Sequence, residues 1–205
     1  MTIGEVIKLI HQSLLLFFQV AKERLATFRG PQAPIDAPAA DFGNASYLHY
    51  LLLRREDALF MELGGELKRA GKDGLFAAWM FHHSDGVQAA ALAYAERLVS
   101  EQFLKVICKA DVNLRPVLDR VYRLYAVDCI ERALGWYAVS DAGLTLDMAK
   151  AVPAEARQLC RDLAEDAVGL AEAFGLPDAM LSAPVACDWI SYNQYDNQGE
   201  LQTDD

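Results

Sequence analysis

Two adjacent histidines, His82 and His83, are the residues of this chain that most suggest a metal site. Neighbouring side chains on a helix point about 100° apart, so adjacent histidines rarely bind the same ion. The residues four positions further on are Gly86 and Val87, and neither can be a ligand. We therefore predict no metal site. The two histidines either make structural hydrogen bonds or contact a cofactor or a partner.

Motifs for other catalytic or cofactor sites are missing from the sequence. A di-iron centre in a helical bundle needs Glu-x-x-His on each of two helices. The residues three positions before the four histidines are Lys8, Ser46, Trp79 and Met80. The sequence also lacks the glycine-rich, phosphate-loop and Gly-x-Ser-x-Gly motifs of dinucleotide, nucleotide and hydrolase sites. We name no catalytic residue, and any cofactor-binding residues stay unknown.

A cluster of four charged residues, Arg54-Arg55-Glu56-Asp57, lies within a leucine-rich stretch. Leucines at helical spacing before and after the cluster define an apolar face, and we place Arg54, Arg55 and Glu56 on the opposite face. Such a face is usually solvated or ion-paired. The alternative is that one arginine recognises a ligand.

The overall charge and the cysteines restrict the class of protein. The 205 residues include 19 Lys and Arg and 29 Asp and Glu, which gives a net charge of −10. Because such a charge repels a phosphate backbone, we expect no nucleic acid partner. The chain ends in residues 202–205, which do not resemble a Ser-Lys-Leu peroxisomal address. With no paired cysteine motif, we expect reduced, buried thiols in a cytoplasmic protein. The four cysteines are Cys108, Cys129, Cys160 and Cys187.

Two long amphipathic segments between Ser84 and Val139 form the predicted centre of the fold. Their apolar residues recur mainly at three- and four-residue steps, which indicates helices rather than strands. Residues 110–113 interrupt the pattern, and Pro116 fits the first turn of the second helix. Each helix would be about 35–40 Å long at 1.5 Å per residue. The sequence therefore predicts a long helical hairpin.

The remaining segments complete an all-α bundle of five or six helices around this hairpin. We divide the chain into an amphipathic helix over 1–29, a proline-rich linker over 30–44, the bundle over 45–200 and a frayed tail over 201–205. Within the bundle, one helix is expected from about Ala45 to Arg69. Another is expected to begin at Val152-Pro153, with the proline in its first turn, and to continue to Phe174.

The N-terminal segment carries a regular apolar seam. Its run Leu14–Phe18 is about a quarter of the ~20 residues that a membrane span needs, and charged residues flank it on both sides. The seam fits a core helix of the same chain, a subunit contact or a membrane-surface helix. Leu14 and Phe17 are the predicted interface residues. The seam consists of Ile7, Ile10, Leu14, Phe17, Ala21, Leu25 and Phe28.

Aromatic residues also gather near the polar C-terminal end. Trp79 and Trp136 are expected in the core, whereas Trp189 lies close to the tail. With Tyr192 and Tyr195, three large aromatic side chains lie near this end, which is more than a frayed tail requires. We predict that these three residues form a contact surface.

Seven sequence pieces between Tyr47 and Gly199 follow one another in a specific order and spacing, although each alone is a common helical pattern. The pieces are 51–56, 89–97, 118–130, 159–163, 173–177, 183–185 and 195–196. In this order they resemble the C-terminal helical domain of flavin-dependent acyl-CoA oxidases, relatives of the acyl-CoA dehydrogenases. The resemblance covers about three quarters of the chain.

The resemblance implies a function that needs other polypeptide parts. Such oxidases bind acyl-CoA and flavin mostly in preceding domains, which also carry the catalytic glutamate, and this chain is too short to contain them. The resemblance implies that the chain is an accessory subunit or a separated domain. Such a chain would form a homo-oligomer or bind a flavoprotein chain. FAD would then be bound only together with that partner. The alternative is a non-enzymatic helical dimerisation module that retains only the fold.

Overall fold

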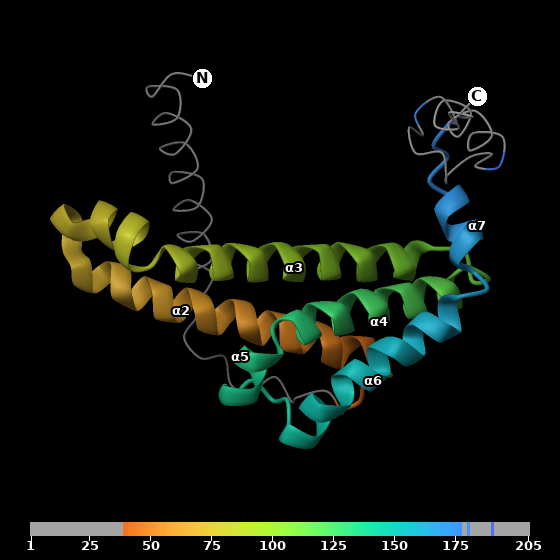
Figure 1. Cartoon of the computed structure of the whole chain (residues 1–205), viewed down its shortest axis with the longest axis horizontal. Coiled ribbons are helices and arrows are strands. Elements are labelled where there is room, and N and C mark those ends of the chain that lie inside the picture. The colour runs from red at the N-terminus through yellow and green to blue at the C-terminus, as the bar shows by residue number, and fades with distance from the viewer. Residues whose placement is uncertain (1–38, 178–179, 181–189, 191–205) are drawn as a thin grey trace, which may run out of the picture. The chain divides into compact units, whose positions relative to one another are not determined.

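The computed structural model describes residues 39–177, 180 and 190, and these form six α-helices and one π-helical turn, with no strand among them (Figure 1). The all-α prediction is confirmed. The predicted helix 1–29, most of the linker 30–44 and the tail 201–205 lie outside the described residues. Among the helices that the structure describes, none has the length and apolar character needed to cross a membrane.

Helix α2 spans Ala45–Ala77 and is longer than the sequence predicted. Asn44 caps its start, because the side chain accepts hydrogen bonds from the backbone N–H of Ser46 and Tyr47. Gly71 adopts φ 66° and ψ −175°, a conformation that glycine reaches without steric cost. The helical backbone is therefore broken at Gly71, close to the predicted end at Arg69, but it resumes after this glycine.

The predicted hairpin is formed by α3, Ser84–Lys109, and α4, Arg115–Arg132. A π-helical turn, Ala78–His82, leads into α3. The Asp111 side chain accepts a 2.9 Å hydrogen bond from the backbone N–H of Asn113 in the connecting turn. At 26 residues, α3 has about the predicted length. The second arm is shorter than predicted, since α4 ends at Arg132 and a separate helix, α5, covers Leu134–Val139.

Helix α6 spans Leu146–Leu163, so the predicted start at Val152 is wrong. The side chain of Thr145 accepts a hydrogen bond from the backbone N–H of Met148, and this cap starts the helix earlier. Pro153 therefore lies inside the helix, where it has no N–H to donate to the preceding turn. The predicted continuation to Phe174 is also interrupted, because α7 covers only Ala167–Glu172.

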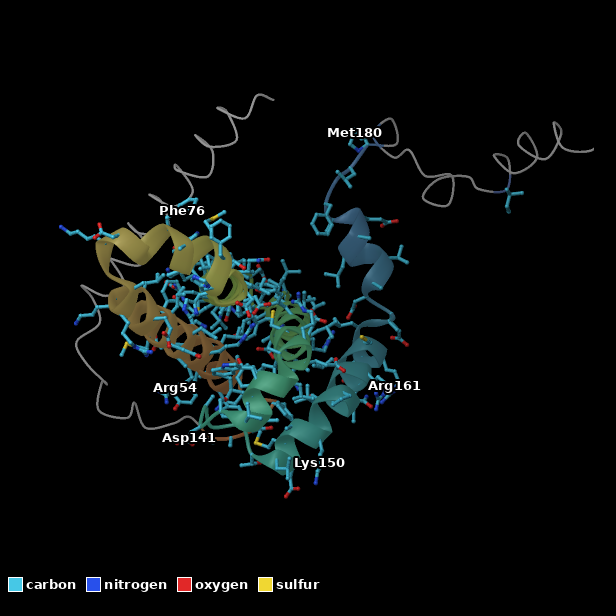
Figure 2. All side chains as sticks on the ribbon, turned by 60° about the vertical axis from the view of Figure 1, so that its left-hand side comes forward. Arg54, Phe76, Asp141, Lys150, Arg161 and Met180 are labelled. Atoms are coloured by element: carbon cyan, nitrogen blue, oxygen red, sulfur yellow. The ribbon has the colours of Figure 1, made fainter. Side chains whose placement is uncertain are left out.

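Helix α2 contacts both arms of the hairpin, and α6 packs on α4 (Figure 1). Side chains fill the space between these helices (Figure 2). The larger core cluster joins the start of α2 to α4, α5 and α6. Its least exposed members, at 0–1% exposure, are Tyr47, Leu48, Leu51, Leu52, Tyr122, Ala126, Val127, Cys129, Ile130, Tyr137, Val152 and Leu159.

A second, smaller core cluster joins α2 to the start of α3. It consists of Leu59, Leu63, Ala90 and Ala93, with Trp136 packed against both clusters. Trp79 is buried, so the prediction of core tryptophans is confirmed for this residue. The chain divides between Leu163 and Ala164 into two compact units.

Candidate functional site

Two ion pairs cross the contact between α2 and α3. Arg55 Nη1 lies 2.6 Å from Glu96 Oε2. Arg97 contacts Glu56 through two nitrogens, with Nε 2.5 Å from Oε2 and Nη2 3.2 Å from Oε1. The dipeptide Arg55-Glu56 thus faces the dipeptide Glu96-Arg97, which has the same charges in reverse order. Each helix supplies one cation and one anion.

These four side chains are buried, which makes their pairing decisive for stability. The exposed fractions are 9% for Arg55 and 6% for Glu96, and 8% and 1% for Arg97 and Glu56. Burial alone would lower the pKa of Arg97, but the hydrogen bond and charge of Glu56, together with Glu101 and Tyr94, raise that pKa overall. The Nε of Arg55 has no hydrogen-bond partner among the described residues. A buried charge in such a position depends strongly on its partner.

The buried pairs continue outward to the surface. Arg97 Nη1 lies 2.7 Å from Glu101 Oε2, and Lys105 Nζ lies 2.6 Å from the other oxygen of that carboxylate. The hydrogen bond from Lys105 is the main cause that lowers the pKa of Glu101. On the other side, Arg132 lies 3.6 Å from Glu96. The result is two neighbouring sets of ion pairs on α2, α3 and α4, which we together call the α2–α3 ion network.

A chain of hydrogen bonds runs beside this network. His49 Nδ1 lies 2.8 Å from Ser100 Oγ, which lies 2.9 Å from the hydroxyl of Tyr122. That hydroxyl also donates to the carbonyl oxygen of Ala45, at 3.3 Å. Burial raises the pKa of Tyr122 to about 12, so the phenol stays protonated at neutral pH. The hydrogen bonds connect the start of α2 to α3 and α4.

A serine beside a histidine can act as a nucleophile when the histidine takes its proton and a substrate can reach the oxygen. Ser100 is fully buried, and its hydroxyl is shared between His49 and Tyr122. Burial is also the largest cause that lowers the pKa of His49, followed by the charge of Arg97. The arrangement supports a structural role for Ser100 rather than attack on a substrate.

Three further tyrosines fix the helices through backbone carbonyls. Tyr125 donates to the carbonyl of Glu96 at 3.0 Å, and Tyr137 donates to that of Leu51 at 3.0 Å. Tyr47 donates to the carbonyl of Gly143 at 2.8 Å. A tyrosine hydroxyl buried in this way needs a partner, and each of these bonds joins segments distant in sequence.

The cysteines differ in burial. Cys129 is buried, and burial is the main cause that raises the pKa of its thiol to about 11. The thiol therefore stays protonated at neutral pH, and thiols in that state are poor nucleophiles. Cys108 and Cys160 are exposed, so the prediction that all the cysteines are buried is wrong for these two. Cys187 lies outside the described residues.

A shallow, open pocket of about 390 Å³ lies between α4 and α6. Its lining includes carboxylates, guanidinium groups and the exposed residue Cys160. The pocket is open to solvent, unlike the enclosed sites that are usual for small molecules. Its lining residues are Leu124, Asp128, Glu131, Pro153, Ala156, Arg157, Cys160 and Arg161.

The residues considered as sites from the sequence are spread over the structure. His82 is exposed, whereas His83 Nε2 lies 3.9 Å from Glu66 Oε2. Figure 2 shows Arg54 on the outer side of α2, and this residue is exposed. Within the described part of the chain, no three histidine, cysteine or acidic residues are grouped as metal ligands. The predicted interface residues lie outside the described residues: Leu14, Phe17, Trp189, Tyr192 and Tyr195.

The prediction that Arg55 and Glu56 lie on the polar face of α2 is wrong, since both are buried, whereas the ion pairing expected as one alternative is confirmed for both. The spacing of these two residues from the preceding leucines indicates their burial. Arg55 is four residues after Leu51, and Glu56 is four residues after Leu52, so they continue the buried face. Glu96 and Arg97 continue the buried face of α3 after Ala93 in the same way. The mirrored charges of the two dipeptides do not single out this pairing, because Glu-Arg also occurs at 23–24 and 131–132.

The helices, their packing and the ion pairs define an all-α domain in which the buried polar side chains hold the helices together. Within this class, the chain matches the family model for acyl-CoA oxidase over residues 48–188, which is more than half of its length. The chain belongs to the acyl-CoA oxidase family. The resemblance to acyl-CoA oxidases that the sequence shows is thereby confirmed at the level of the family.

One curated relative extends this finding. The acyl-coenzyme A oxidase of Kluyveromyces lactis is 26% identical over 113 residues, which cover 55% of this chain and 15% of that protein. The match thus includes less than one sixth of the relative's length. No solved structure matches the chain.

Proposed function

We propose that this chain acts in fatty acyl-CoA oxidation as an accessory subunit or separated helical domain of a flavin-dependent acyl-CoA oxidase or dehydrogenase. In this role it supports dimerisation and the flavin site of a catalytic partner chain. The observation that carries the proposal is the family match over residues 48–188. The matched region begins in α2 and includes every later described helix.

The α2–α3 ion network supports this role by fixing the main helices against one another. Its buried arginines and carboxylates require a defined register, since each charge needs its own partner. A domain that helps to form another chain's cofactor site benefits from such rigidity, because the site must be held in place by its supporting elements. FAD would be bound jointly with the partner rather than by this chain alone.

For the partner contact we propose the three aromatic residues near the C-terminal end, Trp189, Tyr192 and Tyr195. Large aromatic side chains dominate the energy of many protein interfaces. A subunit contact through Leu14 and Phe17 stays a prediction. An engineered disulfide at Phe17 separates it from packing within one chain, because the bond forms either within one monomer or between two chains.

The test is affinity capture of the tagged, full-length protein from its native cell extract, followed by a visible absorbance spectrum. We expect a larger flavoprotein in the eluate and bound flavin, with no flavin on the purified chain alone. Trp189→Ala with Tyr192→Ala should abolish capture. Phe174→Ala is the matched control, since it removes a highly exposed aromatic residue elsewhere. Acyl-CoA oxidation by the captured complex would then identify the reaction.

Two results would contradict the proposal. If the purified chain alone binds flavin, no partner is needed for the cofactor. If the chain elutes as a colourless homo-oligomer with no flavoprotein, the non-enzymatic helical dimerisation module is favoured instead.

A further inference from the structure

Helix α3 carries an apolar stripe on the side opposite its buried face. Leu92, Val99 and Val106 are 48%, 49% and 54% exposed. Ala95 and Gln102 lie between them and are also exposed. The five residues follow steps of three, four, three and four, so they line one side of the helix over about 21 Å. We call this set the α3 stripe.

None of the described helices of this unit covers the α3 stripe. The buried residues of α3 include Ala90, Ala93 and Arg97, which face α2. At 100° per residue, the centre of the α3 stripe is on the far side of the helix from them. Figure 1 shows α2 and α4 together below α3. Large exposed valines and leucines at such regular spacing are typical of a face that packs against another helix.

The N-terminal segment has the same spacing as the α3 stripe. Ile7, Ile10, Leu14, Phe17 and Ala21 are also separated by three, four, three and four residues. Both sets therefore extend over the same helical length, and both alternate as the a and d positions of a two-helix seam do. We infer that residues 7–21 form a helix that docks on the α3 stripe of the same chain.

The chain between the two elements is long enough for this arrangement. Ala45 lies at the start of α2, next to the Tyr122 hydroxyl that also contacts Ser100 of α3. The linker from Phe28 to Ala45 can extend over about 50 Å, which exceeds the length of α3. A tether of this kind keeps the segment at a high local concentration beside its own α3.

Charge favours an antiparallel orientation. In that register Phe17 lies opposite Ala95, and Ala21 lies opposite Leu92. The basic residue Arg24 then lies near Asp85, at the start of α3. The parallel register would instead bring Arg24 to Lys109, which has the same charge.

Engineered disulfides test both the contact and its direction. In the full chain with Cys108, Cys160 and Cys187 replaced by serine, Phe17→Cys is combined with Ala95→Cys. We expect oxidation to close a loop within one monomer, detected by intact mass and faster migration without reductant. The matched control is Ile10→Cys with Ala95→Cys, the pair of the parallel register. The proposed orientation predicts little closure for it.

A second pair of variants tests the stripe without cysteines. Val99→Asp places a charge in the proposed contact, whereas Val112→Asp places one at a valine of the hairpin turn that is 70% exposed. We expect Val99→Asp to increase proteolytic cleavage within residues 7–28 by about tenfold, with no change for Val112→Asp. Leu14→Asp should reproduce the effect of Val99→Asp.

The possible results separate the alternatives. Equal cleavage in Val99→Asp and Val112→Asp would overturn the proposal. So would a disulfide formed between two chains, because the N-terminal seam would then belong to a subunit contact. Closure in the control pair but not in the test pair would overturn the antiparallel docking. Each of these results is independent of whether a flavoprotein partner exists.

Discussion

The two halves of α2 differ in how they are held. In the proximal half, residues 45–59, Tyr47, Leu48, Leu51 and Leu52 are at most 1% exposed and belong to the larger core cluster. In the distal half, residues 60–77, Leu63 is the one buried residue, and Gly71 interrupts the helical backbone. The ion network is anchored at Arg55 and Glu56, near the end of the proximal half.

This difference indicates two levels of stability within α2. The proximal half is fixed by apolar burial, by buried ion pairs and by tyrosine hydrogen bonds. The distal half depends mainly on the smaller cluster around Leu59 and Leu63. We therefore expect the distal half and the π-helical turn after it to open locally more often than the rest of α2. Substitutions in the two regions test this difference.

The largest effect is expected at the ion network. Glu96→Gln removes the charge that pairs with Arg55 and leaves a buried guanidinium uncompensated. We expect a loss of about 3–5 kcal/mol in the free energy of unfolding, measured by urea denaturation. The same change at Glu66, which pairs with the exposed Arg69 in the distal half, should cost under about 1 kcal/mol.

A double replacement tests whether charge is the cause of that loss. Arg55→Met with Glu96→Leu removes both members of the pair and keeps apolar volume. Buried ion pairs can often be replaced in this way at little cost, so the double variant should be more stable than Glu96→Gln. If both variants lose the same stability, lost packing and not the unpaired charge explains the result.

Core truncation compares the two apolar clusters directly. Leu51→Ala opens a cavity in the larger cluster at a residue with no exposure, and we expect a loss of about 4 kcal/mol. Leu63→Ala, at 5% exposure in the smaller cluster, should cost about 2 kcal/mol because its surroundings can relax. Equal losses in thermal or urea unfolding would show that the two halves of α2 are held equally.

Two glycines of the distal half should respond in opposite directions. Gly71 has φ 66° and ψ −175°, a region that other residues avoid, so Gly71→Ala should destabilise by about 1–3 kcal/mol. Gly64 is helical with no atom near its missing side chain. Gly64→Ala should therefore stabilise by about 0.5–1 kcal/mol. A neutral Gly71→Ala would show that the break in α2 is not maintained in solution.

Much of the fold was predictable because it depends on local signals. Apolar spacing and the Asp111 turn gave the hairpin, and the overall helical class followed from the same periodicity. The start of α6 was missed because Pro153 looked like a first-turn proline, whereas Thr145 provides the actual cap. The π-helical turn at Ala78–His82 has no such pattern, since it depends on how α2 and α3 meet.

The site was harder to predict than the fold. Charged residues are normally assigned to the surface, and that expectation misplaced Arg55 and Glu56. Their burial is possible only because Glu96 and Arg97, 41 residues further along the chain, supply the opposite charges. The contact between Ser100 and His49 could not be predicted for the same reason, since it exists only once α2 and α3 are paired. Local patterns do not contain such long-range pairings.

The smallest expected effect concerns pH. Burial and the charge of Arg97 lower the pKa of His49 in the folded protein below its ordinary value of 6.5. As pH falls through 6.5, the unfolded chain takes up a proton at this residue before the folded protein does. The free energy of unfolding should therefore decrease, with a slope of at most about 1.4 kcal/mol per pH unit from this group.

His49→Gln isolates this contribution, because glutamine can still hydrogen-bond to Ser100 but does not titrate. Between pH 8 and pH 5, roughly the range in which histidine titrates, the variant should show a flatter stability curve than the parent chain. The pKa of Glu101 is lowered from 4.5, so its own contribution is lost only at lower pH and does not overlap. If the two curves run parallel, His49 titrates alike in the folded and unfolded states. The proximal half of α2 would then not exclude solvent from that ring.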